Sequence, residues 1–381
     1  TSVLQTPILL LGSLIILVLG FKELGGWDEM MRVCGAVTVN DYGDTMTNLI
    51  RSNDDANFPW LGALIGSAII GFWYWCTDQF IVQRVLSGKN EMEARRGTIF
   101  GAYLKLLPVF LFLIPGMIAF ALHQKYIGAG GEGFLPMLEN GTANADAAFP
   151  TLVAKLLPAG VKGLVVCGIL AALMSSLASL FNSSAMLFTI DFYKRFRPQT
   201  SEKKLVGIGQ VATVVIVILG ILWIPIMRSV GDVLYTYLQD VQSVLAPGIA
   251  AAFLLGICWK RTSAQGGMWG LISGMVIGLT RLGAKVYYSN AGEVADSTFK
   301  YLFYDMNWLF FCGWMFLFCI IVVIVVSLAT EAPTAEKIQG LVFGTATKEQ
   351  KASTRASWNH WDIIHTVIIL AITGAFYWYF W

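Results

Sequence analysis

The sequence predicts an all-α, polytopic membrane protein, and three observations support that fold class. Hydrophobic residues make up 56% of the 381 residues and charged residues only 13%, whereas an average soluble domain carries roughly 25% charged residues. The mean hydropathy is +0.65. Apolar runs of about 20 residues, the length that crosses a bilayer as a helix, recur along the chain. Together these observations exclude a disordered chain and a secreted disulfide scaffold.

Nine segments have the length and apolar character of spanning helices. In chain order they are residues 7–21, 58–80, 98–122, 161–192, 205–227, 233–259, 266–286, 308–328 and 361–381. The first segment is a few residues short and the chain begins with Thr1 rather than Met, so we expect that an N-terminal part precedes it. The polar stretch 330–360 is predicted to be a cytoplasmic linker.

The loops between these segments predict an orientation. Fifteen Lys and Arg residues, among them Arg95, Lys194 and Lys260, lie in one alternate set of loops, and eight, among them Lys285, lie in the other. Because Lys and Arg collect in cytoplasmic loops, the first set is predicted to face the cytoplasm. The chain is therefore predicted to be a multi-pass protein of the plasma membrane or the bacterial inner membrane, surrounded by lipid.

Composition also excludes several classes of function. A net charge of +2 provides no electrostatic footprint for nucleic acid. The six cysteines form no C-x2-C pair and the three histidines are widely separated, so neither a zinc site nor an iron–sulfur site is predicted. No nucleophile–base pair occurs within a span, so we predict neither an enzyme nor a cofactor.

The first polar group at membrane depth lies in residues 73–79 (WYWCTDQ). Aromatic rings cover the C–H face of a sugar, while carboxylate and amide groups fix its hydroxyls. Tyr74 and Asp78 are spaced i, i+4 and share a helix face, as do Trp75 and Gln79. We predict that Tyr74, Trp75 and Asp78 bind substrate. An aromatic belt at the membrane interface is the alternative, and for Trp73 we favour it.

Lys105 lies seven residues into its predicted span and is followed by Pro108 and Pro115. A lysine at that depth needs a partner or a water-filled cavity. The prolines free backbone carbonyls, which are tolerated only where protein or cavity satisfies them. Lys105 is therefore a candidate substrate contact, with a structural ion pair as the alternative.

Ala172, Ser175 and Ser176 are spaced i, i+3, i+4 and form one face of small residues. Hard cations such as Na⁺ favour oxygen ligands, and two hydroxyls with one carbonyl supply half of such a shell. The alternative is a helix-packing seam, which small residues commonly form in membranes. From these residues alone, the seam is the favoured interpretation.

Gln239 and Asp240 precede Pro247 and Gly248 within one predicted span. A Pro-Gly pair in mid-span predicts a kinked or broken helix, and such breaks mark transporter sites. The Gln239 amide offers donors and an acceptor to a hydroxylated ligand, so it is a candidate substrate contact. Asp240 has no assigned role and is expected to reach the interface.

These four groups, in this order, resemble the sodium/glucose cotransporter family of sodium:solute symporters. The matching stretches are WYWCTDQFIVQRVLSGKN at 73–90, GAYLKLLPVFLFLIPGMI at 101–118, LAALMSSLASLFNSSAMLFTIDFYK at 170–194 and YTYLQDVQSVLAPGIAAAFLLGICWKR at 235–261. The resemblance covers most of 58–283 and fits the last two spans more loosely.

The resemblance implies a LeuT-type inverted-repeat core that lacks most of its first repeat, with nine spans in this chain. It implies one transmembrane transporter domain over 1–381. Within it, the second core repeat covers about 58–286 and flanking helices cover about 305–381. The chain would then begin inside the last helix of the first repeat.

The resemblance also implies roles for single residues. Tyr74 matches an inner-gate tyrosine beneath the sugar, and Lys105 and Gln239 match contacts to sugar hydroxyls. Ala172 matches a carbonyl ligand of Na⁺, and Ser175 and Ser176 match its hydroxyl ligands. Gly71 departs from the family pattern, which often has Asn or Thr there, and this leaves the preferred sugar open.

The sequence therefore predicts a secondary transporter that couples Na⁺ entry to uptake of a hexose-like sugar of the glucose/galactose type by alternating access. Na⁺ is expected as a transported ion, with no cofactor. The alternatives are a sodium symporter for sialate, proline or pantothenate, and a sugar-gated channel or sensor. The aromatic residues around Tyr74, together with Gln239, favour a neutral sugar.

Overall fold

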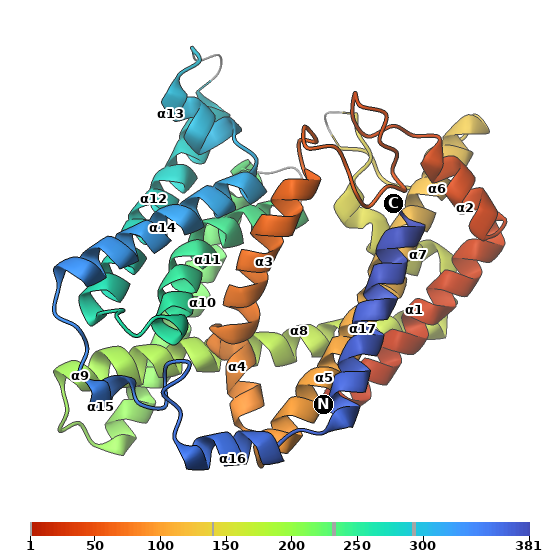
Figure 1. The fold of residues 1–381 in the computed structure, drawn as a ribbon. Coiled ribbons are helices and arrows are strands. Elements are labelled where there is room, and N and C mark those ends of the chain that lie inside the picture. Colours follow the sequence, from red (N-terminus) through yellow and green to blue (C-terminus); the bar gives the residue numbers. More distant parts are fainter. Residues whose placement is uncertain (1, 139–140, 231–233, 292–294) are drawn as a thin grey trace. The chain divides into compact units, whose positions relative to one another are not determined.

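The computed structural model of the chain describes residues 2–138, 141–230, 234–291 and 295–381. Over these residues the chain is built from helices, and its extended pairings are isolated β-bridges (Figure 1). The predicted all-α class is confirmed. The chain divides into two compact units, which are described separately. Unit 1 contains residues 1–49, 100–224 and 378–381, and unit 2 contains residues 50–99 and 225–377.

The long helices of the structure correspond to the predicted spans. They are α1 (Ser2–Leu24), α3 (Trp60–Cys76) with α4 (Gln79–Leu86), α5 (Glu91–Pro108) with α6 (Ile114–Gly128), α8 (Ala159–Leu187), α10 (Glu202–Val230), α11 (Leu234–Cys258), α12 (Ala264–Asn290), α14 (Trp308–Ala329) and α17 (His360–Tyr379). Among the described residues, seven helical segments are long and apolar enough to span a membrane, or eight if bent α3–α4 is one span. The predicted count of nine is not confirmed. The remaining segment is α12, which is long but is made less apolar by its glycines and by Arg281 and Lys285.

Two spans contain a wider helical turn that the sequence analysis did not predict. The π-helix η1 (Val109–Leu113) joins α5 to α6, and η3 (Phe188–Tyr193) joins α8 to α9 (Lys194–Phe196). Pro108 has no N–H group, and the wide turn begins directly after it, where Ile114 N–H donates to Val109 O. Such π-bulges are frequent at functional sites.

The core of unit 1 lies where α1 packs against α6 and α7 (Ala148–Leu156). Its fully buried residues include Ile16, Ile118, Leu122 and Leu152. The helix α1 also approaches α8 closely, because a Cβ atom at Gly12 would overlap the Val165 side chain. A short helix, α2 (Trp27–Gly35), packs on α6 through the buried residues Met30 and Cys34.

In unit 2, α3, α11, α12 and α14 pack together (Figure 1). Glycine permits the closest approaches between these helices. Four buried glycines recur every fourth residue of α12, at 266, 270, 274 and 278. A Cβ atom at Gly278 would lie 2.8 Å from the carbonyl oxygen of Val244 in α11, and one at Gly274 would lie 3.1 Å from Gly248 Cα. Stripes of small residues bring helix backbones together in this way in membranes.

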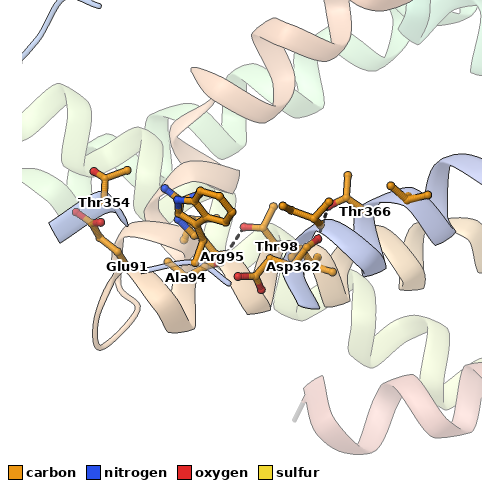
Figure 2. Close-up of a pocket in the computed structure, with 12 residues that line it drawn as sticks. Glu91, Ala94, Arg95, Thr98, Thr354, Asp362 and Thr366 are labelled. Atoms are coloured by element: carbon orange, nitrogen blue, oxygen red, sulfur yellow. Dashed lines mark hydrogen bonds between the residues drawn. The ribbon is translucent and has the colours of Figure 1, made fainter. Parts of the chain in front are cut away.

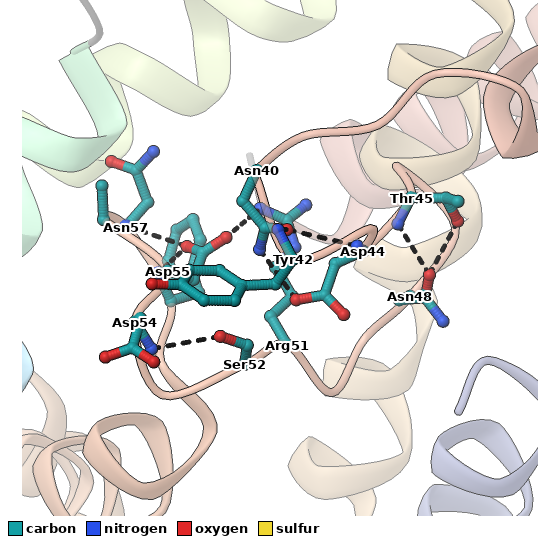
Figure 3. Close-up of polar contacts among 12 residues, drawn as sticks. Asn40, Tyr42, Asp44, Thr45, Asn48, Arg51, Ser52, Asp54, Asp55 and Asn57 are labelled. Atoms are coloured by element: carbon teal, nitrogen blue, oxygen red, sulfur yellow. Dashed lines mark hydrogen bonds and ion pairs between the residues drawn. The ribbon is translucent and has the colours of Figure 1, made fainter.

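Several segments between the long helices are held by side-chain hydrogen bonds or contain a short helix of their own. In the segment between α2 and α3, the Asn48 side chain accepts hydrogen bonds from Thr45 N–H and its hydroxyl (Figure 3). Further along, the buried Asp55 carboxylate accepts hydrogen bonds from the backbone N–H groups of Asn57 and Phe58. The predicted linker 330–360 contains α16 (Lys348–Ala356), which begins with a capping box at Thr347.

The glycine stripe generates the first prediction. Gly278→Ala should lower the melting temperature of the purified protein, because the added methyl group meets the Val244 backbone and overpacking costs about 1–3 kcal/mol. Gly283→Ala is the matched control in the same helix, since nothing lies within 4 Å of its Cβ position. A Gly278→Ala protein that melts at or above the temperature of the Gly283→Ala protein would contradict the packing described.

Candidate functional site

The apolar helical segment of residues 60–86 is broken between α3 and α4. The two helices are bent by 50° relative to each other at Thr77 and Asp78. The carbonyl of Trp73 accepts hydrogen bonds from Thr77 N–H, from Asp78 N–H and from the Thr77 hydroxyl, which closes the end of α3. The sequence analysis predicted one uninterrupted segment here, and the structure corrects that prediction.

The predicted aromatic site lies in the last turn of α3, directly before the break. The rings of Tyr74 and Trp75 meet edge to face with centroids 5.2 Å apart. Tyr74 is half-buried and Trp75 is 49% exposed. One turn earlier, a Cβ atom at Gly71 would meet nothing within 4 Å. Open space therefore lies where the resemblance leads one to expect an Asn or Thr side chain.

Asp78 has a local structural role in addition to its predicted contact with substrate. It is the N-cap residue of α4, and its Oδ1 accepts a hydrogen bond from Phe80 N–H at 3.0 Å. An N-cap carboxylate satisfies one of the N–H groups that the first turn of a helix leaves without a partner. Asp78 thus stabilises the break beside Tyr74 and Trp75.

Gln239 lies in the second turn of α11, a helix that packs against α3 in unit 2. Its side chain is half-buried, and Nε2 lies 3.4 Å from the hydroxyl of Tyr235, one turn earlier. Gln239 and Tyr235 therefore share one face of α11. A kink or a break was predicted at Pro247–Gly248, and a break is wrong, because α11 is a continuous α-helix through both residues.

Lys105 and the predicted sodium ligands belong to unit 1. Lys105 lies in α5, one turn before η1, and its side chain is exposed. Ala172, Ser175 and Ser176 lie in the continuous helix α8, so their predicted common face exists. Ser175 is half-buried and Ser176 is exposed. A π-bulge follows both sets of residues, η1 after Lys105 and η3 after the serines.

Asp240 is placed differently from the expectation that it reaches the interface. It is buried in unit 2, and its carboxylate pairs with Arg281 at 3.4 Å and with Lys285 at 2.5 Å, both from α12. Lys285 is therefore part of a helix and of an ion pair, whereas the orientation argument counted it in a loop. The sequence analysis also gave Arg281 no role. A charged residue within an apolar segment is a candidate for a structural or functional role, so its position could have indicated one.

A cavity of about 660 Å³ lies elsewhere in unit 2, between the first turns of α5 on one side and the end of α16 with the first turns of α17 on the other. Figure 2 shows Glu91, Arg95 and Thr98 on one side of it and Asp362 and Thr366 on the other. None of the residues predicted to bind substrate or sodium lines this cavity. The candidate site therefore rests on the α3–α4 break and not on this cavity.

Comparison with known proteins identifies the family of the chain. The family model described as the sodium:solute symporter family matches residues 1–274. The chain belongs to this family. It is a multi-pass membrane protein, as the family and the apolar helices together show. The resemblance found in residues 73–261 is thereby confirmed.

Three relatives show where the chain lies within the sodium:solute symporters. The sodium/mannose cotransporter of Bos taurus is 35% identical over 407 residues, which cover 100% of this chain and 67% of that protein. Sodium/myo-inositol cotransporter 2 of Homo sapiens is 36% identical over 356 residues, covering 91% and 53%. Sodium/glucose cotransporter 1 of Ovis aries is 37% identical over 358 residues, covering 87% and 52%. The chain spans about half to two thirds of the length of these relatives.

The α3–α4 break generates the second prediction. Asp78→Ala should destabilise the protein by about 1 kcal/mol, because the Phe80 N–H loses its partner, whereas Asp78→Asn should keep the stability since Asn caps as well as Asp. Thermal melting of the purified variants measures the difference. Equal losses in the two variants would show that charge, and not capping, is what Asp78 contributes to stability.

Proposed function

We propose that this symporter couples the entry of Na⁺ to the uptake of a hexose-like sugar by alternating access. The observation that carries the proposal is the broken helix α3–α4, which ends in the aromatic pair Tyr74 and Trp75. Discontinuous helices mark the substrate sites of secondary transporters, and aromatic rings suit the apolar face of a sugar. Gln239, which lies in the same unit, supplies hydrogen bonds to hydroxyl groups. For Lys105, the proposed contact with hydroxyl groups is supported by the family resemblance alone.

The proposed sodium ligands are the carbonyl of Ala172 and the hydroxyls of Ser175 and Ser176. Their common face on α8 supports the proposal, since three oxygens at i, i+3, i+4 can converge on one small cation. Bound Na⁺ stabilises the outward-open arrangement in which the sugar site is formed, and this differential stability couples the two solutes. Na⁺ is transported, so it is a substrate and not a cofactor.

The sodium gradient supplies enough free energy for concentrative uptake. One Na⁺ that crosses a potential of roughly 100 mV gains about 2.3 kcal/mol. A tenfold concentration gradient adds about 1.4 kcal/mol. With one ion for each sugar, the sum supports an accumulation on the order of 500-fold.

The relatives favour neutral, polyhydroxylated solutes over charged ones. The three compared here are named for mannose, myo-inositol and glucose, and none of these solutes carries a charge. Because of this chemistry we prefer a sugar to sialate, proline or pantothenate. A cyclic polyol is the second candidate, since two aromatic faces and an amide also suit an inositol ring. A sugar-gated channel or sensor would bind the same solutes without accumulating them.

The direct test is uptake of radiolabelled solutes into proteoliposomes that contain the full-length protein. The panel includes glucose, galactose, mannose, myo-inositol and proline, each with and without an inward Na⁺ gradient. We expect Na⁺-dependent accumulation of at least one hexose and none of proline. Accumulation of proline alone would refute the sugar assignment, and solute-dependent currents without accumulation would indicate a channel or sensor.

Gln239 provides the third prediction. Gln239→Ala should raise the sugar concentration for half-maximal uptake about tenfold, the effect of one lost hydrogen bond of roughly 1.4 kcal/mol, while the Na⁺ dependence stays similar. Gln265→Ala is the control. Gln265 is an exposed glutamine at the start of α12, whereas the start of α11, which contains Gln239, lies beside the end of α12. An unaltered sugar dose curve in the Gln239→Ala protein would remove Gln239 from the site.

Ser176 provides the fourth prediction. Ser176→Ala removes one hydroxyl from the proposed Na⁺ shell, so the Na⁺ concentration for half-maximal uptake should rise by about tenfold at saturating sugar. Ser184→Ala, two turns further along α8, should leave Na⁺ activation unchanged. Identical Na⁺ activation curves for both variants would reject the sodium assignment.

A further inference from the structure

Asp240, Arg281 and Lys285 form a largely buried ionic group in unit 2. The Arg281 side chain is 0% exposed, and the Asp240 and Lys285 side chains are 11% and 21% exposed. Two cations face one carboxylate, so the group carries an excess positive charge. Buried charges are costly unless they are paired, so this cluster needs a physical reason.

Arg281 joins four segments of unit 2. Besides Asp240 in α11, it donates to the carbonyls of Leu302 at 3.3 Å and Met306 at 2.8 Å, which lie in and just after the π-helix η4 (Tyr301–Asp305). Its guanidinium lies 4.0 Å from the ring centroid of Phe311 in α14. The arginine in α12 thus joins the first turns of α11 and α14 to η4.

The seam between α11 and α12 is repetitive apart from this cluster. The two helices run antiparallel, with Val244 against Gly278 and Gly248 against Gly274. Because Gly270 lies one turn further along α12, a slide by four residues would again place glycine opposite Val244 and Gly248. Within the α11–α12 seam taken alone, small residues therefore select weakly between registers that differ by about 6 Å.

The ion pairs remove this ambiguity. Asp240 lies one turn before Val244, at the end of the seam where it reaches both Arg281 and Lys285. A slide by one turn would carry its carboxylate about 6 Å along α12 and break at least one pair in a low-dielectric environment. A single buried polar contact that fixes helix register is the best-attested use of such groups.

We propose that Asp240 is a positioning residue whose ion pairs with Arg281 and Lys285 set the register and rotation of α11 and thereby present Gln239 to the substrate. Gln239 is the residue before Asp240, about 100° around the helix from it, on the face that it shares with Tyr235. The claim that Gln239 is presented to substrate rests on the proposed function. The claim that the ion pairs set the register of α11 is independent of it.

The test measures register and transport separately in the full-length protein. Spin labels at Phe253 of α11 and Leu271 of α12, both exposed side chains, report the distance between the helices in a variant without the six native cysteines. We expect one distance population in the parent protein and a second, displaced by several ångströms, in Asp240→Asn. Asp296→Asn neutralises an exposed carboxylate of the same unit and is the matched control.

Transport gives the second readout. Asp240→Asn should raise the half-saturating sugar concentration about tenfold, as expected for the loss of one hydrogen bond from Gln239, with a much smaller change in maximal uptake. A register change with unaltered sugar affinity would support the register assignment and refute the sugar role of Gln239. An unchanged distance distribution in Asp240→Asn would overturn the positioning proposal.

A second variant keeps the test decisive if Asp240→Asn fails to fold. Asp240→Asn with Lys285→Met leaves only one unpaired cation, so it should fold while still lacking the ion pairs. We expect the displaced distance population and the raised half-saturating concentration to persist in this double variant. Recovery of the parent distance and affinity would show that Asp240 only neutralises charge, and would overturn the proposal.

Discussion

The main physical constraint on this molecule is that polar groups at membrane depth must find their partners within the protein. The break between α3 and α4 meets this constraint locally, because the Trp73 carbonyl accepts three hydrogen bonds and Asp78 caps the next helix. The two terminal nitrogens of the buried Arg281 meet it over longer distances, through a carboxylate and two carbonyls, with an aromatic ring beside the guanidinium, whereas Nε has no hydrogen-bond partner among the described residues. Each arrangement holds an irregular or charged element in an otherwise apolar helix.

The apolar runs predicted most of the fold. Spans such as 308–328 are continuous, strongly apolar and free of charge, so length and hydropathy alone locate the helix. Breaks were harder to predict. Pro247 attracted the prediction of a break, yet proline removes only one hydrogen bond and the helix continues through it. The actual break is at Thr77 and Asp78. The Thr77 hydroxyl caps the end of α3 and the Asp78 carboxylate caps the start of α4, as helix ends in a membrane require.

Helix pairing was the part that the sequence could not predict. The i, i+4 recurrence of glycine in α12 is readable in the sequence and indicates a close-packed face, but it does not name the partner helix. Asp240 and Arg281 are 41 positions apart, and no local pattern connects them. Without that pairing, Asp240 had no role and Lys285 was counted in a loop. The spacing of Ala172, Ser175 and Ser176, in contrast, depended only on helix geometry and was predictable.

In the account proposed here, the broken helix provides the sugar face, α8 provides the oxygens for sodium, and buried ion pairs hold α11 in place between its neighbours. Such a design requires that the movements of the two solutes be linked. The most direct measurement is the influx of radioactive sodium into proteoliposomes that contain the full-length protein, with no membrane potential, before and after addition of external sugar. We expect that a transported hexose stimulates sodium influx in a fixed ratio to its own uptake. Sodium influx that is independent of sugar, with sugar only equilibrating across the membrane, would contradict it.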